Sequence, residues 1–184
     1  ILVNNETGVI QDAEKIGKLV KQKNPHTLFH VDAVQAFGKY PIDVEKMKID
    51  LLTMSGHKIN GPKGIGMLYK REGVKTKPFI LGGGQQQGQR SGTENGAGVA
   101  ALGVAADICF QNMKKNQKTV FKIKKMLAEG ILEMDEVQIN GDSLQESSPY
   151  VLNVTFKGVR SEVLLHALES KDIFVSAGSA CDSK

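Results

Sequence analysis

The segment SGHKINGPKG, residues 55–64, places Lys58 directly after an apolar run, LLTM, that is typical of a buried strand. Lysine is costly to bury, so a lysine at this point of the chain needs a physical reason. One reason is chemical, because a partly desolvated amine can form a Schiff base with a carbonyl compound. The alternative is a structural lysine in a salt bridge, and for an isolated lysine that is the commoner case.

Polar side chains also follow other apolar segments of the chain. Asn5 comes after ILV, and Asp32 comes after FHV. Ligands of open α/β sheets lie beyond the carboxyl ends of the strands, so we expect these side chains to share a site. A carboxylate can hold a protonated pyridine nitrogen, and Gln35, one helical turn later, can face the same ring edge. Ser55 and His57 can hydrogen-bond a phosphate, which completes the parts of a pyridoxal 5′-phosphate site.

The elements that must position these residues follow from hydrophobic periodicity and from Gly and Pro punctuation. A Gly- and Gln-rich segment without periodicity, residues 78–96, predicts a long functional loop. The order of elements predicts an α/β protein whose sheet contains mixed strand directions. We expect helices at 11–23, 97–134 and 161–171, and strands at 27–34, 47–56, 64–71, 137–141, 150–158 and 173–178.

Composition restricts the class of protein. The 184 residues carry a net charge of +4, and the one dense basic run, residues 113–126, is better explained as a solvated helix face than as a nucleic-acid surface. We find no apolar run of about 18 residues and no signal-peptide pattern at the start, so we expect no membrane association. The two cysteines have no paired spacing, which argues against a disulfide framework and against a metal site. A cytoplasmic protein fits these features.

Five motifs of the chain resemble, in order and spacing, those of the cysteine desulfurases. These NifS/IscS-like enzymes belong to the class V, fold-type I family of pyridoxal-phosphate enzymes. The resemblance extends from Val3 to Cys181, and the last motif separates desulfurases from related aminotransferases. The motifs are VNNETG, HVDAVQAFGKYPID, SGHKINGPKGIGMLY, GGGQQQGQRSGTEN and SAGSAC.

The resemblance implies a role for each residue near the predicted strand ends. Lys58 resembles the lysine that binds the cofactor covalently and then moves protons at the substrate α-carbon. Asp32 resembles the partner of the pyridine nitrogen, and Gln35 resembles the donor to the ring phenolate oxygen. Ser55 and His57 match phosphate-binding positions.

Three further residues receive roles only from the resemblance. Asn5 matches an asparagine near the substrate carboxylate and the ring. Thr93 matches a threonine that reaches the phosphate of a neighbouring subunit, which implies a homodimer. Cys181 matches the nucleophile that takes sulfur from L-cysteine, leaving L-alanine and a persulfide. The expected sulfur acceptor is an iron–sulfur scaffold protein or a sulfur-carrier protein.

Other interpretations of the same residues stay open. A selenocysteine lyase or another fold-type I lyase would share the chemistry of Lys58 and Asp32. A non-catalytic homologue that acts as an interaction module would retain only the fold. Without the resemblance, Cys181 is an ordinary loop cysteine, and Cys109, among apolar neighbours, is expected to be a small buried side chain. Asn4 is expected to stabilise a turn.

The expected architecture is a fold-type I transferase with a mixed, mostly parallel sheet, flanking helices and a small α+β C-terminal domain. Residues 1–112 would be the C-terminal part of the large cofactor-binding domain. Residues 113–184 would be part of the small domain with the catalytic cysteine loop. Members of the family are roughly twice this length, which is beyond the size of one ordinary domain. We therefore expect a fragment, incomplete at both ends and inactive alone.

Overall fold

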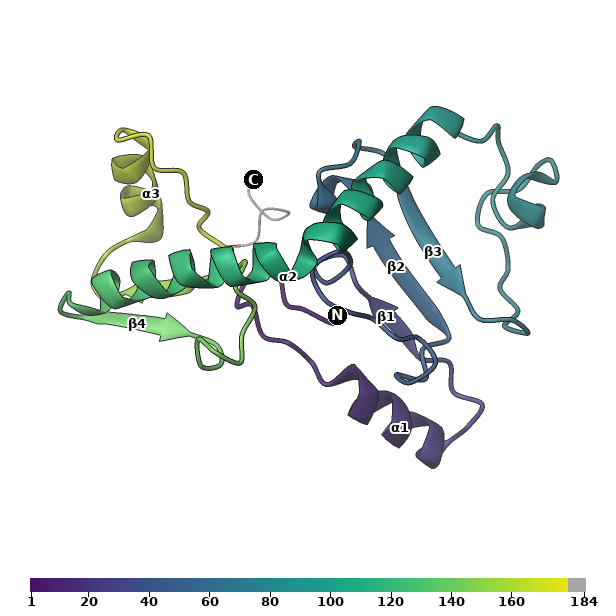
Figure 1. Ribbon diagram of the computed structural model, residues 1–184, viewed down its shortest axis with the longest axis horizontal. Coiled ribbons are helices and arrows are strands. Elements are labelled where there is room, and N and C mark those ends of the chain that lie inside the picture. The colour runs from purple at the N-terminus through teal and green to yellow at the C-terminus, as the bar shows by residue number, and fades with distance from the viewer. Residues whose placement is uncertain (179–184) are drawn as a thin grey trace. The chain divides into compact units, whose positions relative to one another are not determined.

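The computed structural model describes residues 1–178, which form two compact units (Figure 1). The first unit comprises Ile1–Leu2 and Asp12–Met113, and the second comprises Val3–Gln11 and the chain from Lys114 onward. The predicted domain boundary after residue 112 stays a prediction. Within residues 1–178, no helix combines the length and the apolar character needed to cross a bilayer.

The first unit contains a three-stranded sheet in the order β1-β2-β3, with β2 in the centre (Figure 1). Strand β1 (His30–Asp32) pairs with β2 (Leu51–Ser55) in parallel, and β2 pairs with β3 (Gly66–Lys70) in antiparallel orientation. The side chains of β2 alternate in burial, with Leu52 and Met54 in the interior. The predicted mixed sheet is therefore confirmed, with one parallel and one antiparallel pairing in the described residues.

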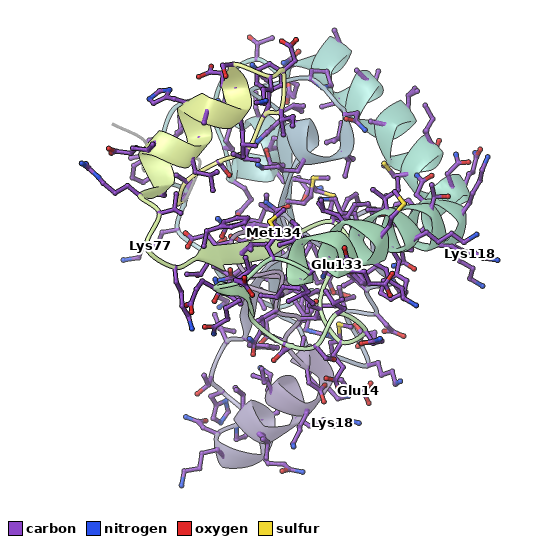
Figure 2. The ribbon with its side chains drawn as sticks, turned by 90° about the vertical axis from the view of Figure 1, so that its left-hand side faces the viewer. Glu14, Lys18, Lys77, Lys118, Glu133 and Met134 are labelled. Carbon is purple, nitrogen blue, oxygen red and sulfur yellow. The ribbon has the colours of Figure 1, made fainter. Side chains whose placement is uncertain are left out.

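Helix α1 (Ala13–Lys23) begins two residues after the predicted start at residue 11 and ends at the predicted residue. The side chain of Asp12 caps it by accepting a hydrogen bond from the backbone N–H of Lys15. On its surface, Glu14 and Lys18 form an ion pair one turn apart (Figure 2). The helix ends before the Asn-Pro pair at residues 24 and 25, because proline disfavours helical backbone in the residue before it.

Helix α2 (Gly96–Leu132) contributes to both units, and its first half packs against the sheet of the first unit. Buried Ala105 contacts Met54 at the end of β2 and Ile59 just beyond it. The rings of Phe37 and Phe110 meet edge to face, with centroids 5.2 Å apart. This core therefore includes Ile59, the residue next to Lys58. Partly buried Phe37, Leu102, Ala106 and Cys109 complete it.

A buried carboxylate, Asp50, ties the sheet to its surroundings. It accepts hydrogen bonds from the Lys21 ammonium and, at 2.7 Å, from the backbone N–H of Phe29. The Arg71 guanidinium lies 3.6 Å from its other oxygen. Burial alone would raise the pKa of Asp50, but these hydrogen bonds and the positive charges of Lys21 and Arg71 outweigh burial and hold it below its usual value. Asp50 therefore links α1, β1 and the end of β3 as an ionised group.

The second unit contains a two-stranded antiparallel sheet of β4 (Val137–Asn140) and β5 (Asn153–Phe156), followed by α3 (Ser161–Glu169). It is an α+β arrangement, as the sequence predicts. The predicted strand at residues 173–178 is wrong, because this segment is exposed and has no strand partner within the described chain. An apolar run of this kind can mark a strand only where a neighbouring strand completes its hydrogen bonds.

The basic run at residues 113–126 is a helix face only in part. Lys118 projects into solvent from α2, as predicted (Figure 2). Lys124, in contrast, is buried, and its ammonium donates to Ser147 Oγ at 2.7 Å and to the Ser148 carbonyl at 2.8 Å. Burial lowers the pKa of Lys124. This lysine therefore attaches the loop before β5 to α2.

Substitution of Asp50 by Asn should destabilise the first unit. The variant leaves Lys21 and Arg71 near an uncharged amide, so we expect the free energy of unfolding to fall by about 3 kcal/mol at pH 7. The lowered pKa means that the carboxylate contributes fully at neutral pH and that this contribution is lost as pH falls through that pKa, so the two proteins should converge in acid. Urea denaturation at several pH values measures both effects.

Glu45→Gln is the control, because Glu45 also pairs with Arg71 but is exposed, and its loss should cost less than about 1 kcal/mol. Equal losses in the two variants would contradict a central role for Asp50.

Candidate cofactor site at the ends of two parallel strands

The parallel pairing of β1 and β2 brings the predicted site residues together. Asp32, the last residue of β1, is paired with Thr53, two residues before the end of β2 at Ser55. The backbone N–H of Ala33 continues the pairing by donating to the Thr53 carbonyl at 2.9 Å. Because neighbouring strands lie about 4.8 Å apart, the carboxylate and the Ser55 segment lie side by side at one edge of the sheet.

Lys58 lies in a short 3-10 helix, η1 (Gly56–Ile59), that starts where β2 ends. The N–H of Gly61 donates to the Gly56 carbonyl at 2.9 Å, and the left-handed conformation of Asn60, with φ 61°, ends the helix. The lysine is consequently held on a tight turn and is half-buried. This turn is the structural reason for the composition of SGHKINGPKG.

Gly56 allows η1 to approach its neighbours closely. A Cβ atom at this position would lie 2.9 Å from Ile65 Cγ2 and 3.2 Å from Leu102 Cδ1 of α2. Its backbone N–H donates to the Ile65 carbonyl at 2.9 Å, which holds the backbone close to this neighbour. The position of Lys58 therefore depends on a glycine two residues before it.

The polar groups at this edge have defined partners. Ser55 Oγ and His57 Nδ1 are 2.7 Å apart, so one hydrogen bond joins the two predicted phosphate ligands. Asp32 Oδ1 accepts from the Val34 N–H at 2.9 Å, and no other donor to this exposed carboxylate occurs in residues 1–178. The second oxygen of Asp32 is thus available to a protonated ring nitrogen.

Lys39 lies next to the predicted site residue Gln35, and the sequence analysis did not identify it. Its ammonium donates to Gln35 Oε1 at 3.3 Å. Burial, and then the positive charge of Lys58, lowers the pKa of Lys39, so the two lysines lie close enough to repel each other. The spacing of four residues from Gln35 to Lys39 was the signal that could have revealed this contact.

The other three predicted site residues belong to other segments of the chain. Thr93 is exposed in the loop between η2 (Gln85–Gly88) and α2, and the described chain offers no hydrogen bond between it and the strand ends. Asn5 is exposed in a turn of the second unit. Cys181 lies outside the described residues. The structural role predicted for Asn4 is confirmed, since its Oδ1 accepts from the N–H groups of residues 6 and 7.

A hollow of the described surface lies along α1. None of the predicted site residues contributes to it. Its lining consists of Asp12, Glu14, Lys15, Lys18, Leu19 and Gln22.

Comparison with known proteins identifies the family. Residues 1–183 match the model of the family described as aminotransferase class-V. A cysteine desulfurase IscS from Methanosarcina thermophila is 43% identical over 183 residues, covering 100% of this chain and 45% of that protein. A cysteine desulfurase IscS from Clostridium botulinum (strain Hall) is 44% identical over 185 residues, covering 100% of this chain and 46% of that protein. The chain belongs to the aminotransferase class-V family, and it spans about half the length of the curated relatives it matches.

Solved structures show the same fold. A NifS-like protein superimposes with a TM-score of 0.91 at 39% identity, over 96% of this chain and 48% of that one. The predicted fold-type I architecture is therefore confirmed for the part of the fold that this chain covers.

The strand-end residues fit the cofactor of this family, pyridoxal 5′-phosphate. The Lys58 amine suits the aldehyde of the cofactor, and the free oxygen of Asp32 suits its ring nitrogen. The Ser55 hydroxyl and the His57 ring present hydrogen-bonding groups to a phosphate. Gln35 adds an amide that can donate to a ring oxygen.

Substitution of Gly56 by Ala should disturb the turn that carries Lys58. The added methyl group would overlap Ile65 and Leu102, so we expect a loss of about 1–3 kcal/mol in the free energy of unfolding and weaker cofactor binding. Gly103→Ala in α2 is the matched control, because nothing lies within 4 Å of its Cβ position. Alanine in an open helix position should stabilise by about 0.5–1 kcal/mol. Thermal denaturation and absorbance titration with the cofactor measure both; unchanged binding by Gly56→Ala would contradict the proposed support of Lys58.

Proposed function

We propose that the protein containing this chain is a cysteine desulfurase, which removes sulfur from L-cysteine with pyridoxal 5′-phosphate and yields L-alanine. The observation that carries the proposal is the placement of Asp32 and the Lys58 turn at the ends of two neighbouring parallel strands. The desulfurase relatives, which match over the whole chain, support this reaction in preference to others of the family.

Four side chains hold the cofactor beside Lys58 in this proposal. Lys58 binds it covalently through its amine, and Asp32 keeps the ring nitrogen protonated. Gln35 donates to the ring oxygen, while Ser55 and His57 bind the phosphate. When bound, the cofactor supplies an electron sink for the carbanion that forms next to the substrate amine.

The remaining steps belong to the protein and to the substrate. After the substrate amine has replaced Lys58, the freed Lys58 amine takes the proton from the substrate α-carbon, and Asn5 contacts the substrate carboxylate. The thiolate of Cys181 then attacks the substrate sulfur. A sulfur–sulfur bond forms, the carbon–sulfur bond breaks, and its electron pair stays with the substrate β-carbon, which takes up a proton. Lys58 returns its proton to the α-carbon. Alanine leaves, and Cys181 keeps the sulfur as a persulfide.

The persulfide needs an acceptor, and the proposal includes one. An iron–sulfur scaffold protein or a sulfur-carrier protein would receive the sulfur atom in the cytoplasm. The IscS and NifS names of the relatives support a link to iron–sulfur cluster assembly.

The reaction can be tested on the protein at its natural full length. Wild-type protein with cofactor and L-cysteine should release equal amounts of alanine and reducible sulfur. Lys58→Ala should lose the visible absorbance of the bound cofactor and lower the rate by at least about 10²–10⁴-fold. Cys181→Ala should lose the protein persulfide, whereas Cys109→Ala should keep it. Alanine formation that is independent of Cys181 would overturn the persulfide step.

The proposed homodimer shares its sites through Thr93, and mixed dimers test this. One subunit carries Lys58→Ala and the other carries Thr93→Ala, each nearly inactive alone. If Thr93 serves the neighbouring subunit, the mixed dimer has one intact site, and its activity should rise to about half that of wild type. If Thr93 serves its own subunit, both sites stay damaged and mixing restores nothing, which would contradict the shared site.

A further inference from the structure

Lys39 contacts the proposed cofactor site without belonging to the set of cofactor ligands. It lies in the turn after β1, half-buried, and donates to Gln35 Oε1 at 3.3 Å. The charge of Lys58 acts on it directly. Its position places a second cation beside the lysine that would bind the cofactor.

The hydrogen bond to Lys39 determines which atom of the Gln35 amide is left for a ligand. An ammonium group has three donors and no acceptor, so the amide atom that faces it must be the oxygen. The two N–H donors of Gln35 then remain for another partner. Without the ammonium, the amide can rotate by 180° about its last torsion, because that torsion has two nearly equal states.

The segment that carries Lys39 is held firmly. Gly38 has φ 72°, and a Cβ atom there would lie 3.0 Å from Cys109 Cβ and 3.1 Å from Ile59 Cγ2. The backbone N–H of Lys39 donates to the Ala36 carbonyl at 3.0 Å. The turn is therefore packed against both η1 and α2, and the stem of Lys39 starts from a fixed backbone.

We propose that Lys39 is a positioning residue that locks the Gln35 amide with its N–H groups toward the cofactor, so that the site selects a deprotonated ring oxygen. This inference rests on the proposed function, because the ring oxygen is that of pyridoxal phosphate. A neutral hydroxyl at that oxygen would have to turn its own hydrogen away from Gln35, whereas an oxyanion accepts from it directly.

A double-mutant cycle on the full-length protein tests the inference. The variants are Lys39→Met, which removes the charge and the donors, Lys39→Arg, which keeps both, and Gln35→Ala. Titration of cofactor-free protein with pyridoxal phosphate measures affinity. Lys39→Met should weaken binding about tenfold in the presence of Gln35 and less than about twofold in the Gln35→Ala background. Lys39→Arg should restore most of the affinity.

A second measurement does not depend on the cofactor. In protein labelled with ¹³C-glutamine and free of cofactor, Lys39→Met should move the Gln35 Cδ resonance upfield, since its oxygen loses a charged donor, and Lys39→Arg should not. An unchanged resonance in Lys39→Met overturns the inference.

The outcomes separate this inference from the function on which it rests. Equal losses of affinity in the two Gln35 backgrounds would overturn the inference alone, because Lys39 would then act through its charge only. A wild-type protein that binds no pyridoxal phosphate would overturn the proposed function and the inference with it.

Discussion

The parallel pairing of β1 with β2 is the constraint on which the site depends. Parallel strands end at the same edge of a sheet, so the register of Asp32 with Thr53 brings a carboxylate beside the Ser55 segment. A register shifted by one residue would turn each side chain of β1 to the opposite face. The chemistry proposed for Lys58 and Asp32 therefore follows from backbone pairing before any contact between their side chains.

Two kinds of contact maintain this arrangement. Asp50 joins the sheet to α1 and Arg71 as a buried, ionised group that is held by two partly buried cations. At the opposite end of β2, the close approaches of Gly56 and Gly38 leave no space for a side chain. Asp50 therefore holds the start of β2, and the close-packed glycine turns hold its end. Lys58 follows that end of the strand.

The cations of this chain differ in function because their surroundings differ. Lys118 is solvated on α2, while Lys124 of the same basic run is buried and holds a loop through two uncharged acceptors. Burial, and then the positive charge of Lys58, lowers the pKa of Lys39.

Local patterns in the sequence were sufficient to predict the helices, the strands of both sheets and the strand-end location of Asp32, Ser55 and Lys58. Apolar periodicity and Gly-Pro punctuation act over a few residues, so they can be found without the fold.

Tertiary structure decided the features that depend on residues far apart in the sequence. The segment 173–178 has strand-like composition but no strand beside it, and Lys124 is buried because residues 147 and 148 cover it. The effect of the Lys58 charge on the pKa of Lys39 connects two turns that follow the paired strands β1 and β2. Periodicity predicts which face of a helix or strand is apolar. It does not predict which group packs against that face.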